Sequence, residues 1–435
     1  MPRWCGIDWA EHHHDIAIVD ESGGLVSKIR IEDTAAGFTR LMDLLAVHSV
    51  GCEMPIPVAI ETSKGLLVAN LRSAGVSAYA INPLSVARYR DRYAPSRSKS
   101  DAADALVLAN ILRTDPSVHR LVPEDAELAA SIRVLARAHQ DAIWDRQQTV
   151  GKLRSILREY YPAFLATFED LSSREARATL MLAPSPAAVT KLRRTSLAAS
   201  LRRAGRSRYV DRDVEKILTG LRTAQLRQPA LVEAAMAVQA SAYGRVLTTL
   251  VESIRTLQEQ LETAYHAHPD SKIISRFPGL GTVLGARILG EIGDDRTRFA
   301  TARGLKAFAS TAPITRASGT KTLITMRVVR NKRLGQAAYL WSLPLLAHSP
   351  GGRAHYDKRR AAGDSHSAAS RHLANRGLGM LHHCLSTGST YNETKAFSSH
   401  AQPLATSRSP KAHQAYQEAE APMADSVADG LVLTA

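Results

Sequence analysis

Short apolar runs bounded by turn residues dominate the first 120 or so positions of the chain. Their composition predicts strands at residues 4–7, 15–19, 25–31, 57–60 and 77–81. The spacing of apolar residues predicts helices at 35–46 and 65–74, and Ser22-Gly23-Gly24 provides a hairpin turn between the second and third strands. Three strands followed by alternating helices and strands indicate an α/β domain, a mixed sheet with flanking helices.

Two long helices with coiled-coil-like patterns are predicted further along the chain. The first covers residues 124–161 and has a nearly heptad apolar stripe. The second has a seam that alternates by three and four residues, formed by Leu247, Leu250, Ile254, Leu257 and Leu261. An intramolecular pair and a seam between two subunits both fit this pattern. The residues between the two helices, 165–240, are predicted to be helical and basic.

These patterns divide the chain into four segments. Residues 1–123 form the α/β domain, 124–270 the long-helix region, and 271–390 an all-α C-terminal domain. Residues 391–435 are rich in Ser, Thr, Pro, Ala and His and lose all periodicity, so we expect a disordered tail.

The balance of charged residues indicates what kind of molecule the protein binds. Lys and Arg number 56 against 41 Asp and Glu, which gives a net charge of +15 and a pI near 9.9. A surplus of this size is typical of proteins that bind polyanions such as nucleic acids. A basic protein with no such partner is the plain alternative.

The cysteines and the N-terminus argue for a cytoplasmic protein without disulfides. Cys5, Cys52 and Cys384 have no paired spacing, so neither a disulfide framework nor a zinc site is expected. The sequence shows no apolar run resembling a signal peptide or a membrane span. His12-His13-His14 are consecutive and point in different directions, so we do not expect them to bind a metal together.

Four carboxylates stand where predicted elements begin or end. Asp8 ends the first strand, Glu61 follows another apolar strand, and Asp101 and Asp104 open a helix. Residues i and i+3 share one face of a helix, and adjacent strand ends would bring Asp8 beside Glu61. Taken singly, Asp101 is also a plausible helix N-cap and Asp8 a turn residue. Together, four acids would repel one another unless a hard cation such as Mg²⁺ bound among them.

This ordered set resembles the DEDD, RuvC-like domain of the IS110-family transposases, over residues 1–160. The resemblance implies an RNase H/RuvC-like fold, in which Asp8, Glu61, Asp101 and Asp104 hold two Mg²⁺ ions that act on a phosphodiester. The family also has a basic approach to its DxxD pair, which suits phosphate contact, although a solvated loop is the alternative. The corresponding residues here are Arg88, Arg90, Arg92, Arg97 and Lys99.

Two motifs mark the C-terminal domain. Pro278-Gly279-Leu280-Gly281 resembles a helix-hairpin-helix turn, in which backbone amides at Gly279 and Gly281 approach a phosphate. A tight turn without a ligand is the alternative. The stretch at residues 309–319 resembles the "AxxAPxxxxSG" segment of the IS110-family C-terminal domain, which presents a serine, here Ser318. By itself, a serine before a glycine is more often a turn residue.

The resemblance implies a recombinase. Ser318 would attack the scissile phosphate and form a phosphoserine link, and basic residues would offset the developing charge. These are Lys321, Arg327, Arg330 and Arg333. The family commonly has "RGNxxLRxAL" in this region, whereas Arg330-Asn331-Lys332-Arg333-Leu334 departs from that register. The family also implies double-stranded DNA of element ends and target, a structured guide RNA, and a homo-oligomer, either a dimer or a tetramer.

Two other functions fit the sequence less well. A Holliday-junction endonuclease would use the same carboxylates with water as the nucleophile, and it would not need Ser318. A non-catalytic nucleic-acid-binding protein, descended from a decayed element, would not need the acids. The complete four-acid set argues against decay.

Overall fold

The computed structural model describes residues 1–93, 101–319, 321–325 and 327–397. Within these ranges, the side chains of residues 91–93, 101, 102, 321, 322 and 324 lie outside the description. The chain divides into two compact units, Met1–Glu124 and Asp125–Ala435.

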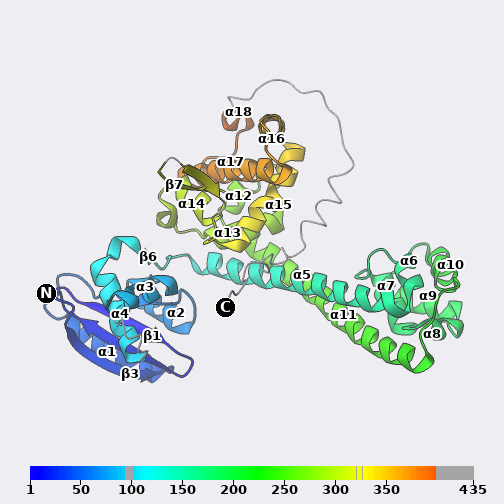
Figure 1. Ribbon diagram of the computed structural model, residues 1–435, viewed down its shortest axis with the longest axis horizontal. Helices are drawn as coiled ribbons and strands as arrows, with labels where there is room; N and C mark the ends of the chain where they lie inside the picture. Colours follow the sequence, from blue (N-terminus) through cyan, green and yellow to red (C-terminus); the bar gives the residue numbers. More distant parts are fainter. Residues whose placement is uncertain (94–100, 320, 326, 398–435) are drawn as a thin grey trace. The chain divides into compact units, whose positions relative to one another are not determined.

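The first unit is built on a six-stranded mixed sheet in the order β3-β2-β1-β4-β5-β6 (Figure 1). The strands are β1 (Trp4–Trp9), β2 (His13–Val19), β3 (Leu25–Glu32), β4 (Val58–Ile60), β5 (Ala78–Ala80) and β6 (Arg120–Leu121). β1, β4 and β5 run parallel, while β2, β3 and β6 pair antiparallel with their neighbours. The predicted mixed sheet with flanking helices is confirmed. β6 was not predicted, because two residues carry no periodicity.

Helices cover both faces of this sheet. On one face, α1 (Ala35–Ser49) and α2 (Leu66–Ser73) bury their leucines against isoleucines of β1, β2 and β4. On the other face, α3 (Pro83–Tyr93) and α4 (Asp101–Thr114) pack around Ala59 of β4. A 3₁₀ turn, η1 (Pro116–Val118), leads to β6.

The closest approach in this unit is that of α4 to β1. A Cβ on Gly6 would lie 2.0 Å from the carbonyl oxygen of Ala105 and 2.5 Å from the amide nitrogen of Ala109. Near the other end of α4, Arg113 donates a hydrogen bond of 3.1 Å to the carbonyl of Glu21, in the β2–β3 turn. That turn lies at the Trp4 end of β1, so the N-terminus of α4 points toward the Asp8 end.

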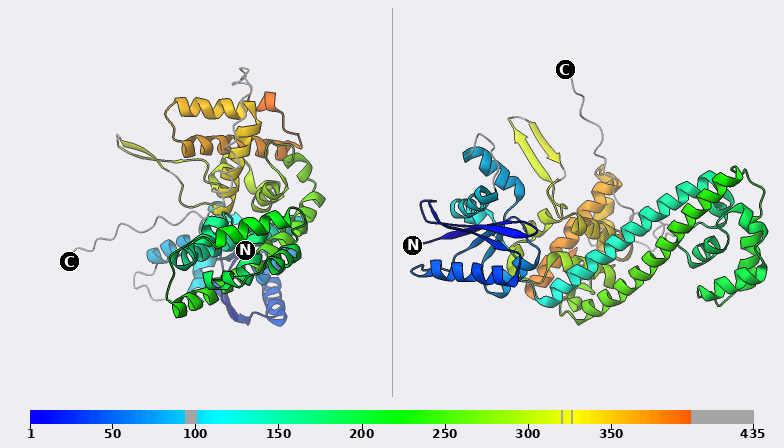
Figure 2. Two further views of the ribbon diagram at one scale, coloured as in Figure 1. Left: turned by 90° about the vertical axis from the view of Figure 1, so that its right-hand side faces the viewer. Right: turned by 90° about the horizontal axis from the view of Figure 1, so that it is seen from below.

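The second unit is organised around two long helices, α5 (Glu127–Tyr160) and α11 (Ala230–Ala267). They pack against each other within one chain and run antiparallel (Figures 1 and 2). The predicted seam is only partly buried, since Leu247 and Leu261 are covered while Leu250, Ile254 and Leu257 are half-buried.

Five short helices join the far ends of α5 and α11, and we call residues 161–229 the tip module. Its helices are α6 (Pro162–Thr167), α7 (Arg174–Leu182), α8 (Pro186–Thr190), α9 (Arg194–Arg203) and α10 (Val210–Leu221). They share one apolar core with the ends of α5 and α11, centred on Tyr160, Tyr161 and Phe164.

A second apolar core surrounds Trp341 at the opposite ends of α5 and α11. Its helical elements are α12 (Ser271–Ile274), α13 (Thr282–Ile292), η2 (Arg296–Phe299), α14 (Ala302–Phe308), α15 (Lys332–His348), α16 (Pro350–Ala361), α17 (His366–Thr387) and α18 (Glu393–Ala396). Two strands, β7 (Ile314–Ser318) and β8 (Lys321–Thr325), pair antiparallel between α14 and α15. The β7–β8 hairpin projects from the helices in both views of Figure 2.

Two expectations for the C-terminal region were wrong. The domain is not all-α, because residues 314–318 and 321–325, which are rich in the β-branched side chains that strands favour, pair on either side of Gly319, whose positive φ of 56° suits a tight hairpin. The disordered tail does not begin at residue 391, because Phe397 is buried in the core and Glu393 accepts a hydrogen bond from Ser349. Residues 398–435 lie outside the described residues.

None of the described helices has the length and apolar character that a membrane crossing demands.

The Gly6 contact predicts an unusual response to a small substitution. Gly6→Ala should destabilise the first unit by about 1–3 kcal/mol, because the added methyl group has no space beneath α4. The matched control is Gly151→Ala in α5, where nothing lies within 4 Å of the added Cβ and alanine should stabilise the helix by up to about 1 kcal/mol. Thermal unfolding followed by circular dichroism distinguishes the two, and equal shifts would contradict the packing described.

Candidate functional site

The ends of β1 and β4 bring two of the predicted acids together. The parallel register pairs Ile7 with Ile60, so Asp8 and Glu61 are the next residues on adjacent strands, which lie about 4.8 Å apart. Gly6 and Ala59, two residues earlier, face α3 and α4. Alternate residues of a strand share one face. Asp8 therefore points to the same helix-covered side as Gly6, and Glu61 to the same side as Ala59.

Asp104 comes to the same edge from α4. It precedes Ala105, the residue in contact with Gly6, on the side of α4 nearest the Asp8 end. Its side chain is 8% exposed and accepts a hydrogen bond of 2.5 Å from Arg90 of α3. The Nε atom of Arg90 is buried without a hydrogen-bond partner among the described residues. The partly buried guanidinium of Arg90 thus neutralises the charge of the Asp104 carboxylate.

Asp15 is a further acid at this edge that the sequence analysis did not single out. It pairs directly with Asp8 in the β1–β2 ladder, so the two side chains share a face. Asp15 is 4% exposed, and Arg30 of β3 holds both of its carboxylate oxygens, at 3.1 and 2.7 Å. The hairpin register that follows from Ser22-Gly23-Gly24 was the signal that could have identified it.

This donor set suits a divalent cation by its chemistry, since carboxylate oxygens are the ligands that Mg²⁺ prefers. Asp8, Glu61 and Asp104 share one face and one end of the sheet. As the side chains stand, however, no three His, Cys, Asp or Glu residues among those described are grouped closely enough to hold a metal. Arg90 engages Asp104, and the side chain of Asp101 lies outside the described residues.

The predicted basic approach to α4 is only partly visible. Arg88 is exposed on α3, and Arg90 is turned inward to Asp104. The side chain of Arg92 and the whole of Arg97 and Lys99 lie outside the described residues. Contact of this segment with phosphate stays a prediction.

The histidine run has a structural explanation. His14 is 1% exposed; its ring accepts a hydrogen bond from the amide of Ala10 and contacts Asp33 at 3.2 Å. These partners explain the buried imidazole without a metal.

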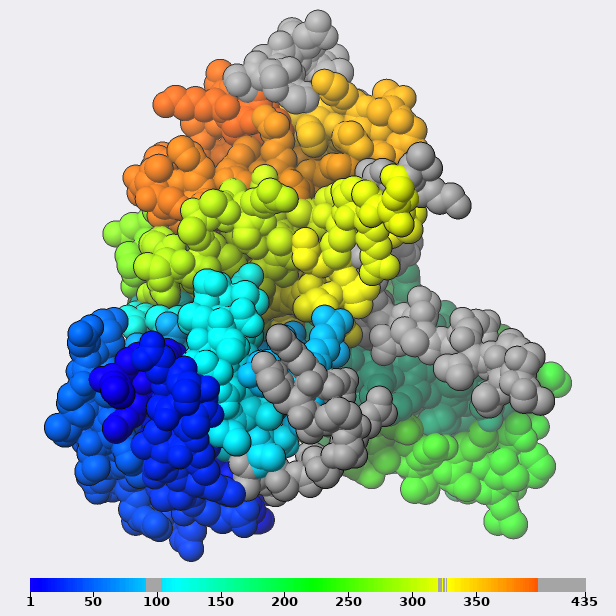
Figure 3. Space-filling model, turned by 60° about the vertical axis from the view of Figure 1, so that its left-hand side comes forward, coloured from blue at the N-terminus to red at the C-terminus, as the bar shows by residue number. Residues whose placement is uncertain are grey.

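Ser318 is the last residue of β7, at the tip of the β7–β8 hairpin. It is exposed, and its hydroxyl has no hydrogen-bond partner among the described residues. In the space-filling view the yellow atoms of this region lie at the molecular surface (Figure 3). A serine in this position is accessible to a large substrate, but no described side chain is placed to accept its proton.

The root of the hairpin is held much more firmly than its tip. Ser310 has a positive φ of 59° and donates a hydrogen bond of 2.9 Å to the carbonyl of Arg327. The amide of Asn331 donates to the carbonyl of Phe308 at 2.8 Å. Both strands are therefore clamped where they leave the helical core.

A buried ion pair lies beneath this root. Glu291 of α13 accepts two hydrogen bonds of 2.7 Å from Arg137 of α5 and one of 2.6 Å from the side chain of Asn331. Burial by itself would raise the pKa of Glu291, but the hydrogen bonds from Arg137 and Asn331 outweigh it and lower the pKa. The hydrogen bonds to Glu291 raise the pKa of Arg137. Both groups stay charged, so the pair ties the hairpin root to α5 and α13.

The cations predicted to contact the phosphate have different environments, and Arg330 and Arg333 lie at the root of the hairpin rather than at its tip. Arg333 donates to Asp141 at 2.7 and 3.0 Å and stacks over Trp144 at 5.0 Å, so its guanidinium has a structural task that the sequence analysis missed. Arg330 lies close to the carbonyl of Arg327. The side chain of Lys321 is outside the description.

The glycines of the PGLG turn also differ from each other. Gly279 has a φ of 77°, and a Cβ there would lie 2.5 Å from Pro344, so backbone conformation and packing explain this glycine. Gly281 is the N-cap of α13 and has open space around it. Since α12 before the turn is only four residues long, a full helix-hairpin-helix stays a prediction.

Comparisons with known proteins cover most of the chain. Residues 5–162 match a family model described as a transposase, the DEDD transposase of IS110. Residues 271–357 match the transposase family IS116/IS110/IS902. The "Mini-circle putative transposase for IS117" of Streptomyces coelicolor is 52% identical over 398 residues, 91% of this chain and 96% of that protein. An uncharacterized 42 kDa protein of insertion element IS900, from Mycobacterium paratuberculosis, is 27% identical over 88% of this chain and 95% of that protein.

The Glu291–Arg137 pair predicts a pH-dependent loss of stability. Glu291→Gln should cost about 2 kcal/mol near neutral pH, because it leaves the half-buried Arg137 without its charge partner. Since folding lowers the pKa of Glu291, its contribution is complete above the unfolded pKa, about 4.3, and is lost as the pH falls through the folded value. Urea unfolding from about pH 3 to 7 measures the difference.

Glu259→Gln is the matched control, because Glu259 is 64% exposed in a surface pair with Arg255 and should change stability by less than about 0.5 kcal/mol. A Glu291→Gln protein as stable as this control at neutral pH would contradict the role of the pair.

Proposed function

This chain belongs to the IS110 family of transposases, and from that premise we propose that it is a site-specific DNA recombinase that uses Ser318 as its nucleophile. The observation that carries the proposal for the cutting chemistry is the placement of Asp8 and Glu61 on adjacent strands, on the face that α4 covers, with Asp104 on the part of α4 nearest that end of the sheet. Membership of a transposase family makes DNA the substrate.

The acids are proposed to hold the metal. Asp8, Glu61 and Asp104, joined by Asp101 from the first turn of α4, would bind two Mg²⁺ ions; an ion bound there neutralises charge on the scissile phosphate. Arg90 must release Asp104 for this to happen. Arg30 reduces the mutual repulsion of Asp8 and Asp15 in the meantime.

Ser318 would carry the covalent step. Its Oγ forms a bond to the phosphorus while the bond from phosphorus to the bridging oxygen of the departing strand breaks. That strand leaves with the oxygen and takes up a proton as a free hydroxyl. The phosphoserine diester conserves the bond energy, and attack by the hydroxyl of another strand rejoins the DNA and restores the serine. Because no described side chain near Ser318 accepts its proton, we assign this task to the carboxylate edge.

The remaining partners follow from charge and from the family. Lys321, Arg327 and Arg330 are proposed to offset charge at the phosphate, whereas Arg333 would have to leave Asp141 to contribute. The +15 charge supports contact with double-stranded DNA and with a structured guide RNA. We propose a homo-oligomer, a dimer or a tetramer, as the working form.

The decisive experiment detects protein joined to DNA. The full chain is incubated with element-end DNA, flanking element RNA and Mg²⁺, then denatured and analysed by gel electrophoresis for a protein–DNA adduct. The wild type should form the adduct, while Ser318→Ala and Asp104→Asn should abolish it. Thr315→Ala, which removes another exposed hydroxyl from β7, should leave it intact.

The same gel separates the rival function. Cleaved DNA without an adduct, equally abundant in Ser318→Ala, would instead identify a Holliday-junction type endonuclease that uses water. That candidate has some support, because the acidic edge is assembled without any contribution from Ser318.

The metal site is tested separately by Mn²⁺ binding, followed by electron paramagnetic resonance. Arg90→Gln removes the cation that neutralises Asp104, so Mn²⁺ should bind about five-fold or more tightly, and Asp104→Asn should weaken binding. Arg88→Gln, an exposed change on the same helix, is the control. Equal affinities in Arg90→Gln and Arg88→Gln would show that Asp104 is not a metal ligand.

A further inference from the structure

The tip module holds a disproportionate share of the positive charge. Residues 161–229 contain 13 Lys and Arg against 6 Asp and Glu, a surplus of seven, whereas the rest of the chain has a surplus of eight. A dense single-sign surface repels itself and is therefore costly unless a partner of opposite charge uses it.

Much of this charge has no partner among the residues that the structure describes. Some arginines are engaged, as Arg194 is with Glu215 and Arg206 with Asp213. Six other cations are exposed, and their side chains make neither an ion pair nor a hydrogen bond with any described residue. They lie on α9 and α10 and in the loops beside them: Lys191, Arg193, Arg202, Arg203, Arg208 and Lys216.

α9 presents these cations at both of its ends, with small residues between them. Leu197 and Leu201 are buried, while the outward positions Thr195, Ser196 and Ala199 are small and exposed. The helix rises about 1.5 Å per residue, so Arg193 and Arg203 are separated by about 15 Å along it. A phosphate backbone can approach such a surface closely and find cations at both ends.

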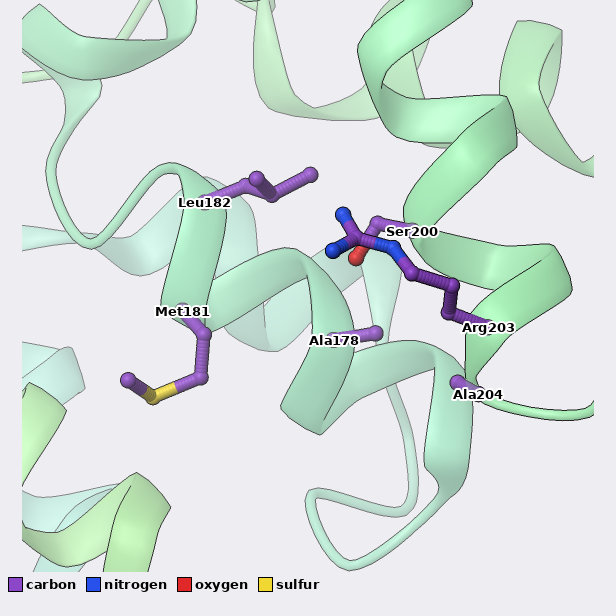
Figure 4. Close-up of a pocket in the computed structure, with 6 residues that line it drawn as sticks. All are labelled: Ala178, Met181, Leu182, Ser200, Arg203 and Ala204. Carbon is purple, nitrogen blue, oxygen red and sulfur yellow. The ribbon is translucent and has the colours of Figure 1, made fainter.

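A hollow of about 420 Å³ opens beside α9. Its wall on α7 is apolar, formed by Ala178, Met181 and Leu182, and Ser200 and Arg203 line the α9 side. The guanidinium of Arg203 turns into the space between the two helices (Figure 4). The hollow is wide open to solvent, so a flat ring could rest against its apolar wall, while the guanidinium of Arg203 suits an adjacent negative charge.

The loop from α9 to α10 adds an exposed aromatic side chain. Tyr209 is 67% exposed and has a φ of 56°, a left-handed conformation that is rare for residues other than glycine. The guanidinium of Arg212 lies 4.6 Å from the ring centre and supports one face, while the ring remains open to solvent. An outward aromatic ring within a basic surface is typical of proteins that stack unpaired bases.

We propose that the tip module binds a single-stranded segment of nucleic acid, with phosphates on Arg193, Arg202 and Arg203 and an unpaired base stacked on Tyr209. The hollow between α7 and α9 accommodates a second base. A duplex would satisfy the cations but not Tyr209, because its bases are already stacked on one another. This site uses neither Ser318 nor the acidic residues, so it is independent of the proposed cleavage chemistry.

The test measures fluorescence anisotropy of three labelled 20-nucleotide probes of one sequence: RNA, single-stranded DNA and duplex DNA. All proteins are full-length and carry Ser318→Ala, and the measurements are made in EDTA, so that neither the serine nor a metal-dependent water reaction cuts a probe and failure of the cleavage proposal leaves this result unaffected. Because the chain is also proposed to bind duplex DNA through other residues, the readout is the affinity lost on changing the tip module, which should be larger for the single-stranded probes than for the duplex. Tighter binding of RNA than of single-stranded DNA would identify a looped RNA as the ligand, and the reverse a displaced DNA strand.

Two sets of variants connect the binding to the site. R202Q/R203Q should reduce the slope of log affinity against log salt by about 1.4 for single strands, at about 0.7 per lost phosphate contact. R40Q/R255Q removes two exposed charges from α1 and α11 and should leave the slope unchanged. Y209L should weaken single-strand binding by about five-fold or more, while Y209F retains it. Circular dichroism confirms that the variants fold.

Equal slopes for the two double variants would overturn the assignment of phosphate contacts to α9. Equal binding by Y209L and Y209F, or a loss of duplex binding in Y209L as large as its loss of single-strand binding, would overturn the single-strand assignment.

Discussion

The acidic edge of the first unit depends on how closely one helix approaches one strand. Because Gly6 has no side chain, the backbone of α4 comes into contact with the backbone of β1 at Ala105 and Ala109. This contact fixes the axial position of α4, and with it the height of Asp104 relative to Asp8 and Glu61. Close backbone packing of this kind is rigid, since protein interiors transmit strain more readily than they absorb it. The position of a carboxylate on a loop would not be fixed by backbone packing in this way. The order of the acids along the chain would then indicate little about where they lie in the fold.

That constraint also explains what could be predicted from the sequence. The strands of the first unit alternate clearly with helices, so the acids could be assigned to strand ends and to the first turn of a helix. The partners of these acids could not. Asp15 and Arg30 meet only through the β2–β3 register, and Arg90 reaches Asp104 from a different helix. Such pairs depend on how side chains of different helices and strands point toward one another, and the spacing of apolar residues along the chain does not reveal this.

The second unit was harder to predict for a related reason. The β7–β8 hairpin is short and packs little apolar surface, so its residues look like a loop between two helices. Its firm attachment depends on Glu291, Arg137 and Asn331, three residues far apart in sequence that meet only in the folded chain. Charged residues in such a network resemble surface residues when they are viewed one at a time. The same is true of Arg333, whose environment beside Asp141 and Trp144 is invisible without the packing of α15 on α5.

The antiparallel pairing of α5 and α11 fixes the distance between the root of the β7–β8 hairpin and the tip module. Arg137 contacts the root of the β7–β8 hairpin through Glu291, and α5 continues from there to Tyr160 at the edge of the tip module. At about 1.5 Å per residue this stretch is about 35 Å long, close to one turn of duplex DNA. Two paired helices resist bending better than one, so the helix pair holds the two ends of the unit at a constant separation. A nucleic acid that touches both ends must span that interval, and its minimum length is set by the number of residues in α5.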